Sequence, residues 1–301
     1  MTTLDTIPLA NACGVTLHRT LRIPDDGGDY PLPPSLGRMA VHVAGPGELV
    51  VPMRRAEALW LEFGGPWWKP HALKVGIGGI DAISGEAFDR ATLSGDPQDY
   101  VVIPEQPWLD GINAGDGFIR QFVAVPLGEG LTVEGQLTGR EDEGGMTIAL
   151  HAPRPGVFPD EAPAPVRAGE MQFASAAGPM QASMGLGAGG RMRQEIYADE
   201  HGVDTWEPEP ADTVHIDLVD ALAFEALTGL KPPPPVVDAQ TYTRHGLPWF
   251  DLIEPTGRDV AAAERLAGVR SIAYLHGLRD TRLPISDAQV VRLLRLRHQP
   301  V

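Results

Sequence analysis

Residues 13–23 read Cys-Gly-Val-Thr-Leu-His-Arg-Thr-Leu-Arg-Ile, and this stretch indicates the class of fold. The apolar side chains of Val15, Leu17 and Leu21 share one parity, which is the two-residue period of a β-strand with one buried face. The cluster Pro24-Asp-Asp-Gly-Gly28 follows directly and predicts a turn. The stretch is therefore typical of a strand that ends in a tight connection.

Similar short runs recur through the first half of the chain. The 35 glycines and 29 prolines disfavour long helices and suit strands joined by turns. We therefore predict a mainly β protein with an antiparallel, β-sandwich-like N-terminal domain over residues 1–152. Its last two strands are expected at 131–137 and 146–150, as a hairpin around 139–145. The other predicted strands cover residues 39–43, 48–52, 73–83, 100–103 and 117–125.

The second half of the chain has a different pattern. Five prolines between positions 153 and 165 predict a Pro-rich linker over residues 153–168. Beyond it we expect a smaller α+β domain over residues 169–301. Within that domain Asp220 is placed to cap a helix over 221–228, and Ser286–Gln289 matches a capping box that would open a C-terminal helix reaching Arg297.

Charge and cysteine content restrict the partners and the compartment. The formal net charge of −16 repels nucleic-acid backbones and anionic lipid, so neither nucleic acid nor a membrane is an expected partner. No stretch reaches 18 consecutive apolar residues. Cys13 is the one cysteine, and the first residues lack the pattern of a secretory signal, so we predict a cytoplasmic protein.

The glycine-rich stretch Gly185-Leu-Gly-Ala-Gly-Gly190 has the letters of a dinucleotide-binding fingerprint. That motif needs a helix after the glycines, whereas residues 191–197 alternate like a strand. We therefore predict a hairpin turn here rather than a phosphate site, and we expect no cofactor.

Motifs for catalysis and for metal binding are weak. Ser84 and Ser183 lie in no Gly-x-Ser-x-Gly motif, and the lone thiol of Cys13 is expected to be a small buried group. His215 and Asp217 share one face of a predicted strand. They are only weak candidates for metal ligands, because no zinc-binding motif accompanies them, and we predict no metal site.

Aromatic and proline-rich turns are the most distinctive surface feature of the sequence. Large rings in loops either fasten a loop to a core or form a binding surface, for instance for a sugar or another flat ligand. Adjacent rings on an extended backbone point to opposite faces, so we expect either Trp67 or Trp68 to face a partner chain, another domain or solvent. The candidate ligand-binding residues are Trp67, Trp68, His71, Trp108, Asp110, Arg120, His245, Trp249 and Asp251.

Two hypotheses for function follow. The first is a non-catalytic binding or assembly protein that uses aromatic and acidic loop surfaces and self-associates as a homodimer. The alternative is an enzyme, such as a hydrolase, that acts on a small molecule or glycan through carboxylates and histidines assembled by the fold. The absence of a catalytic motif favours the binding protein.

Overall fold

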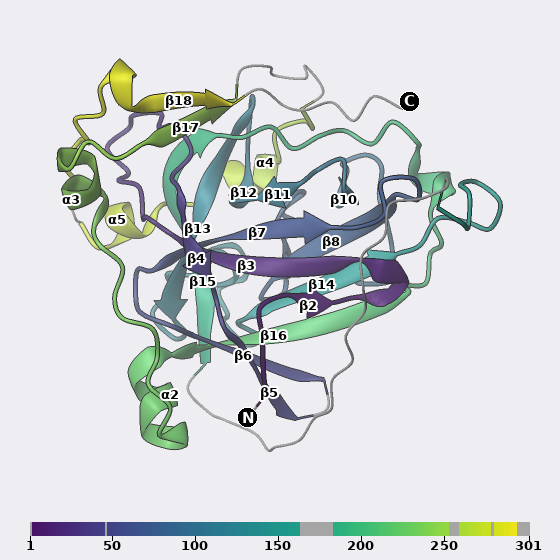
Figure 1. The fold of residues 1–301 in the computed structure, drawn as a ribbon, viewed down its shortest axis with the longest axis horizontal. Coiled ribbons are helices and arrows are strands. Elements are labelled where there is room, and N and C mark those ends of the chain that lie inside the picture. The colour runs from purple at the N-terminus through teal and green to yellow at the C-terminus, as the bar shows by residue number, and fades with distance from the viewer. Residues whose placement is uncertain (1, 46, 163–182, 253–258, 278–279, 294–301) are drawn as a thin grey trace.

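The computed structural model describes residues 2–45, 47–162, 183–252, 259–277 and 280–293 (Figure 1). The strands are β1 (Thr2–Leu4), β2 (Ile7–Pro8), β3 (Gly14–Thr20), β4 (Ser35–Arg38), β5 (Val41–Gly45), β6 (Glu48–Met53), β7 (Ala58–Gly64), β8 (His71–Ile77), β9 (Ile80–Asp81), β10 (Val101–Ile103), β11 (Trp108–Leu109), β12 (Gly111–Gly115), β13 (Phe118–Pro126), β14 (Met146–His151), β15 (Ser183–Arg193), β16 (Asp212–Asp220), β17 (Trp249–Leu252) and β18 (Val290–Leu293). The α-helices are α1 (Val133–Thr138), α2 (Ala221–Thr228), α3 (Ala239–Arg244), α4 (Glu264–Ala267) and α5 (Ile272–Leu275), and 3-10 turns lie at Ala10–Ala12, Val203–Thr205 and Asp287–Gln289.

Sixteen of the described strands belong to one large, nearly closed sheet. Its main path runs β1-β5-β6-β16-β15-β13-β7-β3-β2, and β14 links β16 to β8. Strand β16 pairs with β6 in parallel, whereas β17 and β18 form a separate parallel pair that Figure 1 shows at the upper edge. The mainly β class is thus confirmed, but a sandwich is not.

Strands from both halves of the chain share this sheet. Strand β16 lies between β6 and β14, and β15 pairs with β13, so residues 183–220 continue the sheet of the first half. The predicted linker over residues 153–168 therefore does not separate the strands into two sheets. Of that segment, residues 163–168 lie outside the described part of the chain.

The alternating pattern that opened the sequence forms β3, as predicted. Leu17 pairs with Leu61 of β7, and both side chains are fully buried in the core. His18 pairs with Trp60 on the opposite face. This register places an apolar row in the core and a polar row on the opposite face, because neighbouring residues of a strand point to opposite sides. Both rows of β3 are buried, so the expected single buried face is not observed.

The predicted strand over 131–137 and the predicted C-terminal helix are wrong. Residues 133–138 form helix α1 instead of a strand, because the Thr132 hydroxyl accepts a hydrogen bond from the Gly135 N–H and Gly139 ends the helix at φ 75°. The Ser286 capping box is present, but it opens a single 3-10 turn that passes into β18. Pairing with β17 thus replaces the predicted C-terminal helix up to residue 293, and the remainder lies outside the described residues.

Helix α2 is confirmed in detail. The Asp220 carboxylate accepts hydrogen bonds from the backbone N–H groups of Leu222 and Ala223, and Gly229 ends the helix at φ 69°. Figure 1 shows α2 at the lower left, projecting from the end of β16. Local capping chemistry alone was enough to predict this element.

The stretch Gly185–Gly190 lies inside strand β15 and forms neither a hairpin turn nor a phosphate loop. It pairs with β13, and its glycines allow other segments to approach both faces of the strand. A Cβ atom at Gly187 would lie 2.8 Å from the Leu131 carbonyl oxygen, and one at Gly190 would lie 2.2 Å from the Pro24 carbonyl oxygen. These glycines serve close packing within the strand rather than chain reversal.

Candidate ligand-binding cleft

A cleft of about 490 Å³ lies where the β6–β7 connection meets the segment that leads into α3. The connection supplies residues 54–57, and the opposite wall comes from residues 235–240. Residues 22–24 and 280–283 complete the lining. The lining residues are Arg22, Pro24, Arg54, Arg55, Ala56, Glu57, Pro235, Val236, Val237, Asp238, Ala239, Gln240, Asp280, Thr281 and Leu283.

Arg22 is neutralised by a carboxylate of the same wall. Its two terminal nitrogens donate to the two oxygens of Asp280, each at 3.0 Å. Partial burial acts to raise the pKa of Asp280, but the Arg22 hydrogen bonds and the Asp25 N–H outweigh it and hold the pKa below its ordinary value. Arg22 and Asp280 therefore line the cleft as an ion pair, and neither leaves an unpaired charge for a ligand.

Arg55 is engaged in the same way. Its guanidinium donates to both oxygens of Glu129 at 2.9 and 2.7 Å, and it lies 2.9 Å from His276 Nε2. The carboxylate of Asp238 is also occupied, because it caps α3 by accepting from the Thr241 N–H and hydroxyl, which lowers the pKa of Asp238. Both charges are thus satisfied by their neighbours.

Glu57 is the buried acid at the base of the cleft. It is 6% exposed and forms an ion pair with Arg19, whose Nε donates to it at 2.9 Å. Its second oxygen accepts the Arg54 backbone N–H at 2.9 Å. The Glu57 carboxylate therefore holds the β6–β7 connection by its hydrogen bond to the Arg54 main chain. Its negative charge is paired with Arg19.

Arg54 differs from the other arginines of the cleft. Its Nη2 donates to the Pro233 carbonyl oxygen at 3.2 Å, while its Nε is buried and has no hydrogen-bond partner. Within the described residues it has no carboxylate partner. A buried donor without an acceptor is costly, and an ionised one more so. Arg54 is therefore the arginine of the cleft whose charge an added anion would pair.

The sequence-predicted aromatic residues do not share one site with this cleft. Trp67 is 51% exposed and meets the half-buried Trp68 edge to face, with ring centres 6.0 Å apart. Trp249 is fully buried against Tyr242, and its indole N–H has no partner. Trp108 is half-buried in β11, opposite Glu62 of β7. Trp67 and Trp68 thus contact each other, whereas Trp108 and Trp249 lie in other surroundings.

Two of the predicted polar candidates are buried. Asp110 is 3% exposed and accepts a hydrogen bond from the Gln194 side chain at 2.9 Å; burial raises its pKa to about 7. His71 is fully buried, and burial lowers its pKa. Its Nδ1 lies 2.9 Å from the Lys69 carbonyl oxygen. Both groups are held inside the fold, away from an exposed binding surface.

The other polar candidates lie apart from one another. Arg120 on β13 is 3.5 Å from the Asp25 carboxylate, and His245 is exposed at the end of α3. Asp251 on β17 is half-exposed opposite Arg292. His215 and Asp217 are 3.5 Å apart on β16. In the described part of the chain no group of three or more His, Cys, Asp or Glu side chains is placed to hold a metal ion.

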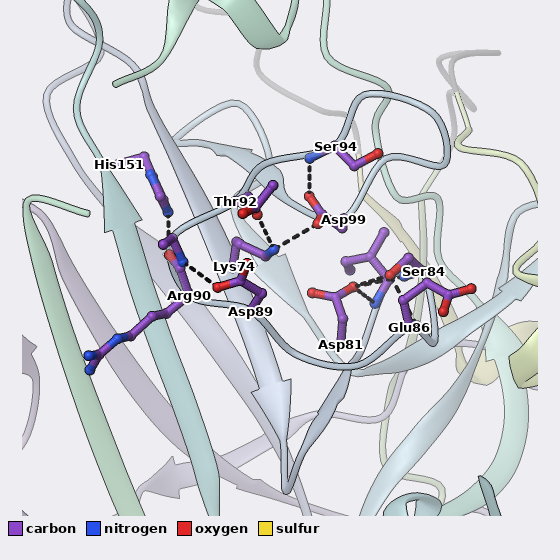
Figure 2. Close-up of polar contacts among 12 residues, drawn as sticks. Lys74, Asp81, Ser84, Glu86, Asp89, Arg90, Thr92, Ser94, Asp99 and His151 are labelled. Carbon is purple, nitrogen blue, oxygen red and sulfur yellow. Dashed lines mark hydrogen bonds and ion pairs between the residues drawn. The ribbon is translucent and has the colours of Figure 1, made fainter. Parts of the chain in front are cut away.

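A second polar cluster is buried beneath the loop over residues 84–99 (Figure 2). Lys74 Nζ donates to Asp99 at 2.7 Å and to the Thr92 carbonyl oxygen at 2.5 Å. Asp81 Oδ1 accepts from Ser84 Oγ at 3.0 Å, whereas Asp81 Oδ2 is buried without a partner. Burial raises the pKa of Asp81 to about 7. We interpret this cluster as fastening the loop to β8, because Lys74, Asp81 and Ser84 are all buried.

No sequence motif indicates the cleft. Arg22, Arg54 and Asp280 are widely separated along the chain, and no motif joins them. The carbonyl oxygens of Pro233 and Pro234 accept from Arg54 and Arg19 at 3.2 and 2.9 Å. An unbroken proline run offers carbonyl oxygens but no N–H donors, which suits it to contact arginine side chains.

Comparisons of the chain with protein-family models, curated proteins and solved structures found no match. Among the described residues, no helix is both long and apolar enough to cross a membrane.

Proposed function

We propose that this protein binds a small organic anion in the cleft and that Arg54 is the residue that pairs with the anionic group. The observation that carries the proposal is that Arg54, unlike Arg22 and Arg55, has no carboxylate partner among the described residues. The remaining arginines of the cleft are already paired with Asp280 and Glu129. A carboxylate or phosphate at Arg54 would gain charge-assisted hydrogen bonds in a partly desolvated place, where such bonds are strongest.

The lining indicates the rest of the ligand. A volume of about 490 Å³ lies within the range of small-molecule sites. Apolar side chains on both walls favour a ligand with an apolar body attached to the charged group; they are Pro24, Ala56, Pro235, Val236, Val237 and Leu283. The net charge of −16 opposes the approach of anions over long distances, so recognition depends on local contacts.

Binding of phenyl phosphate and octanoate tests this proposal. We expect each probe to bind saturably by isothermal titration calorimetry, and we expect Arg54→Gln to weaken binding about tenfold or more, which is about 1.4 kcal/mol. Arg140→Gln is the matched control, because Arg140 is exposed and pairs with Asp142. Absence of saturable binding of both probes at millimolar concentration would contradict the proposal, as would equal binding by the Arg54 and Arg140 variants.

Self-association is a second candidate role, favoured by the exposure of Trp67. Trp67 is 51% exposed whereas its neighbour Trp68 is half-buried, as expected when adjacent rings face opposite sides. If the protein forms a homodimer through this ring, Trp67→Ala should weaken dimerisation by about 2 kcal/mol or more. Trp68→Ala should mainly lower folding stability. Light scattering across micromolar concentrations measures the mass, and a monomer throughout would exclude this role.

A further inference from the structure

Three side chains on the outer face of the sheet form a continuous hydrogen-bonded array. His18 on β3 lies between Ser35 at the start of β4 and Glu62 on β7. His18 Nδ1 is 2.8 Å from Ser35 Oγ, and His18 Nε2 is 2.9 Å from a Glu62 oxygen. Strand pairing explains the juxtaposition, because Ser35 is opposite Thr20 and Glu62 is opposite Thr16, each two residues from His18.

The histidine ring is held in place on a third side. Trp60 stacks on it with ring centres 4.0 Å apart and planes inclined by 11°. His18 is 8% exposed, so its ring has little freedom to leave this position. A ring fixed by stacking and by bonds at both nitrogens is preoriented for proton transfer, and the Trp60 face would also stabilise the positive charge of an imidazolium.

The hydrogen bonds determine the direction of proton transfer. A carboxylate only accepts hydrogen bonds, so the Glu62 contact places the imidazole hydrogen on Nε2. The Nδ1 lone pair then accepts the Ser35 hydroxyl hydrogen. This is the order nucleophile, base, carboxylate that activates a serine in hydrolases of unrelated folds. The roles of the two ring nitrogens are exchanged relative to the chymotrypsin arrangement.

We propose that Ser35 is a nucleophile that hydrolyses small esters, with His18 as its general base and Glu62 as the group that orients the base. Ser35 Oγ attacks the ester carbonyl carbon while its proton passes to His18 Nδ1. The C–O bond to the alcohol then breaks, and the alcohol leaves with the proton from His18. Water, deprotonated by His18, attacks the acyl-serine and releases the acid, and the proton returns to Ser35. One ester and one water thus give one acid and one alcohol.

The surroundings of Ser35 limit the substrate to small, accessible esters. Ser35 itself is exposed, and Glu62 is about half-exposed at 47% of its side chain. Trp60 and Trp108 lie on the same face, because Trp108 is the register partner of Glu62. Such rings favour an aryl ester, whose flat leaving group can lie against an indole. This activity is separate from anion binding at Arg54 and does not depend on it.

Covalent labelling tests the assignment directly. A fluorophosphonate reagent should label the folded protein at Ser35, as identified by peptide mass spectrometry, and 4-nitrophenyl acetate should be hydrolysed with an initial burst of 4-nitrophenol. Ser35→Ala should abolish labelling and the burst. His18→Gln should slow labelling about a hundredfold, within the range for loss of a general base. Glu62→Gln should slow it and alter its pH profile.

Ser183→Ala is the matched control. Ser183 is exposed at the start of β15 and should itself label no more than background, so its removal should leave labelling at Ser35 unchanged. Circular dichroism confirms that each variant is folded. Labelling of wild-type protein at Ser35 that depends on His18 supports the proposal. Failure of the folded wild-type protein to label at Ser35 would overturn it, and so would an unchanged rate of ester hydrolysis in Ser35→Ala. Failure of wild-type protein to label at Ser35 decides against the proposal even if a variant fails to fold.

Discussion

Gly190→Ala should lower the free energy of unfolding by about 3 kcal/mol or more, as measured by urea denaturation. The reason is backbone contact within the core. The added Cβ atom would lie 2.2 Å from the Pro24 carbonyl oxygen and 3.0 Å from the Ile23 side chain. A flexible side chain could move aside, but a backbone carbonyl cannot move without displacing residues 23–24. Those residues are held by Gln121, whose side chain bonds to the Ile23 N–H and the Leu21 carbonyl oxygen.

Gly64→Ala is the control for this prediction. Gly64 also lies in a strand, β7, but the nearest atom to its added Cβ would be the Gly14 carbonyl oxygen at 3.9 Å. We expect this variant to be neutral or to gain a few tenths of a kcal/mol, because alanine has fewer unfolded conformations than glycine. Equal stability of the two variants would show that β15 is not packed as closely as the structure indicates.

Asp81→Asn should remove a pH dependence of folding stability. Burial raises the pKa of Asp81 from 3.8 to about 7, so the folded protein keeps this carboxyl protonated where the unfolded chain has ionised it. Its stabilising contribution is complete below the unfolded pKa and is lost as the pH rises through the folded pKa. At about 1.4 kcal/mol per pH unit, wild-type protein should lose about 3 kcal/mol between pH 4.5 and 8 relative to Asp81→Asn.

The comparison between variants is essential, because other carboxyls titrate in the opposite direction. Lowered pKa values at Asp280 and Glu141 add stability as the pH rises, and both carboxyls are shared by all variants. Asp160→Asn is the control, because the Asp160 side chain is 79% exposed. It should follow the wild-type profile in urea denaturation from pH 4.5 to 8. If the difference in free energy of unfolding between Asp81→Asn and wild type were constant across this range, Asp81 would not be a buried carboxyl that stays protonated in the folded protein.

The strands whose pattern is local could be predicted from sequence. Alternation identified β3 and β16, and capping residues identified α2, because these signals depend on neighbours within a few positions. The missed helix α1 has local capping residues, Thr132 and Gly139, that the sequence contains. The other two errors fell where distant segments decide the structure. Gly185–Gly190 is extended because β13 pairs with it, and residues 290–293 are a strand because β17 lies beside them. A run of glycines is compatible with both a turn and a tightly packed strand.

The candidate sites could not be predicted for a related reason. Ser35, His18 and Glu62 meet because of the register between β4, β3 and β7, and a shift of one residue would place them on opposite faces. Arg54 becomes distinctive only when its partners are known, since its neighbours Arg19, Arg22 and Arg55 each have a carboxylate. The sequence shows which arginines and carboxylates are present. Only the fold shows which of them pair and that Arg54 is left without a carboxylate among the described residues.

The most direct test of the proposed function is the side-chain Nε–H resonance of Arg54 in a ¹H–¹⁵N spectrum during titration with phenyl phosphate. The resonance is assigned by its absence in Arg54→Gln. We predict that it moves saturably as the Arg54 guanidinium gains an anionic partner, with the midpoint found by calorimetry, while the Arg140 resonance stays in place. An Arg54 resonance that does not move while phenyl phosphate binds would contradict the account.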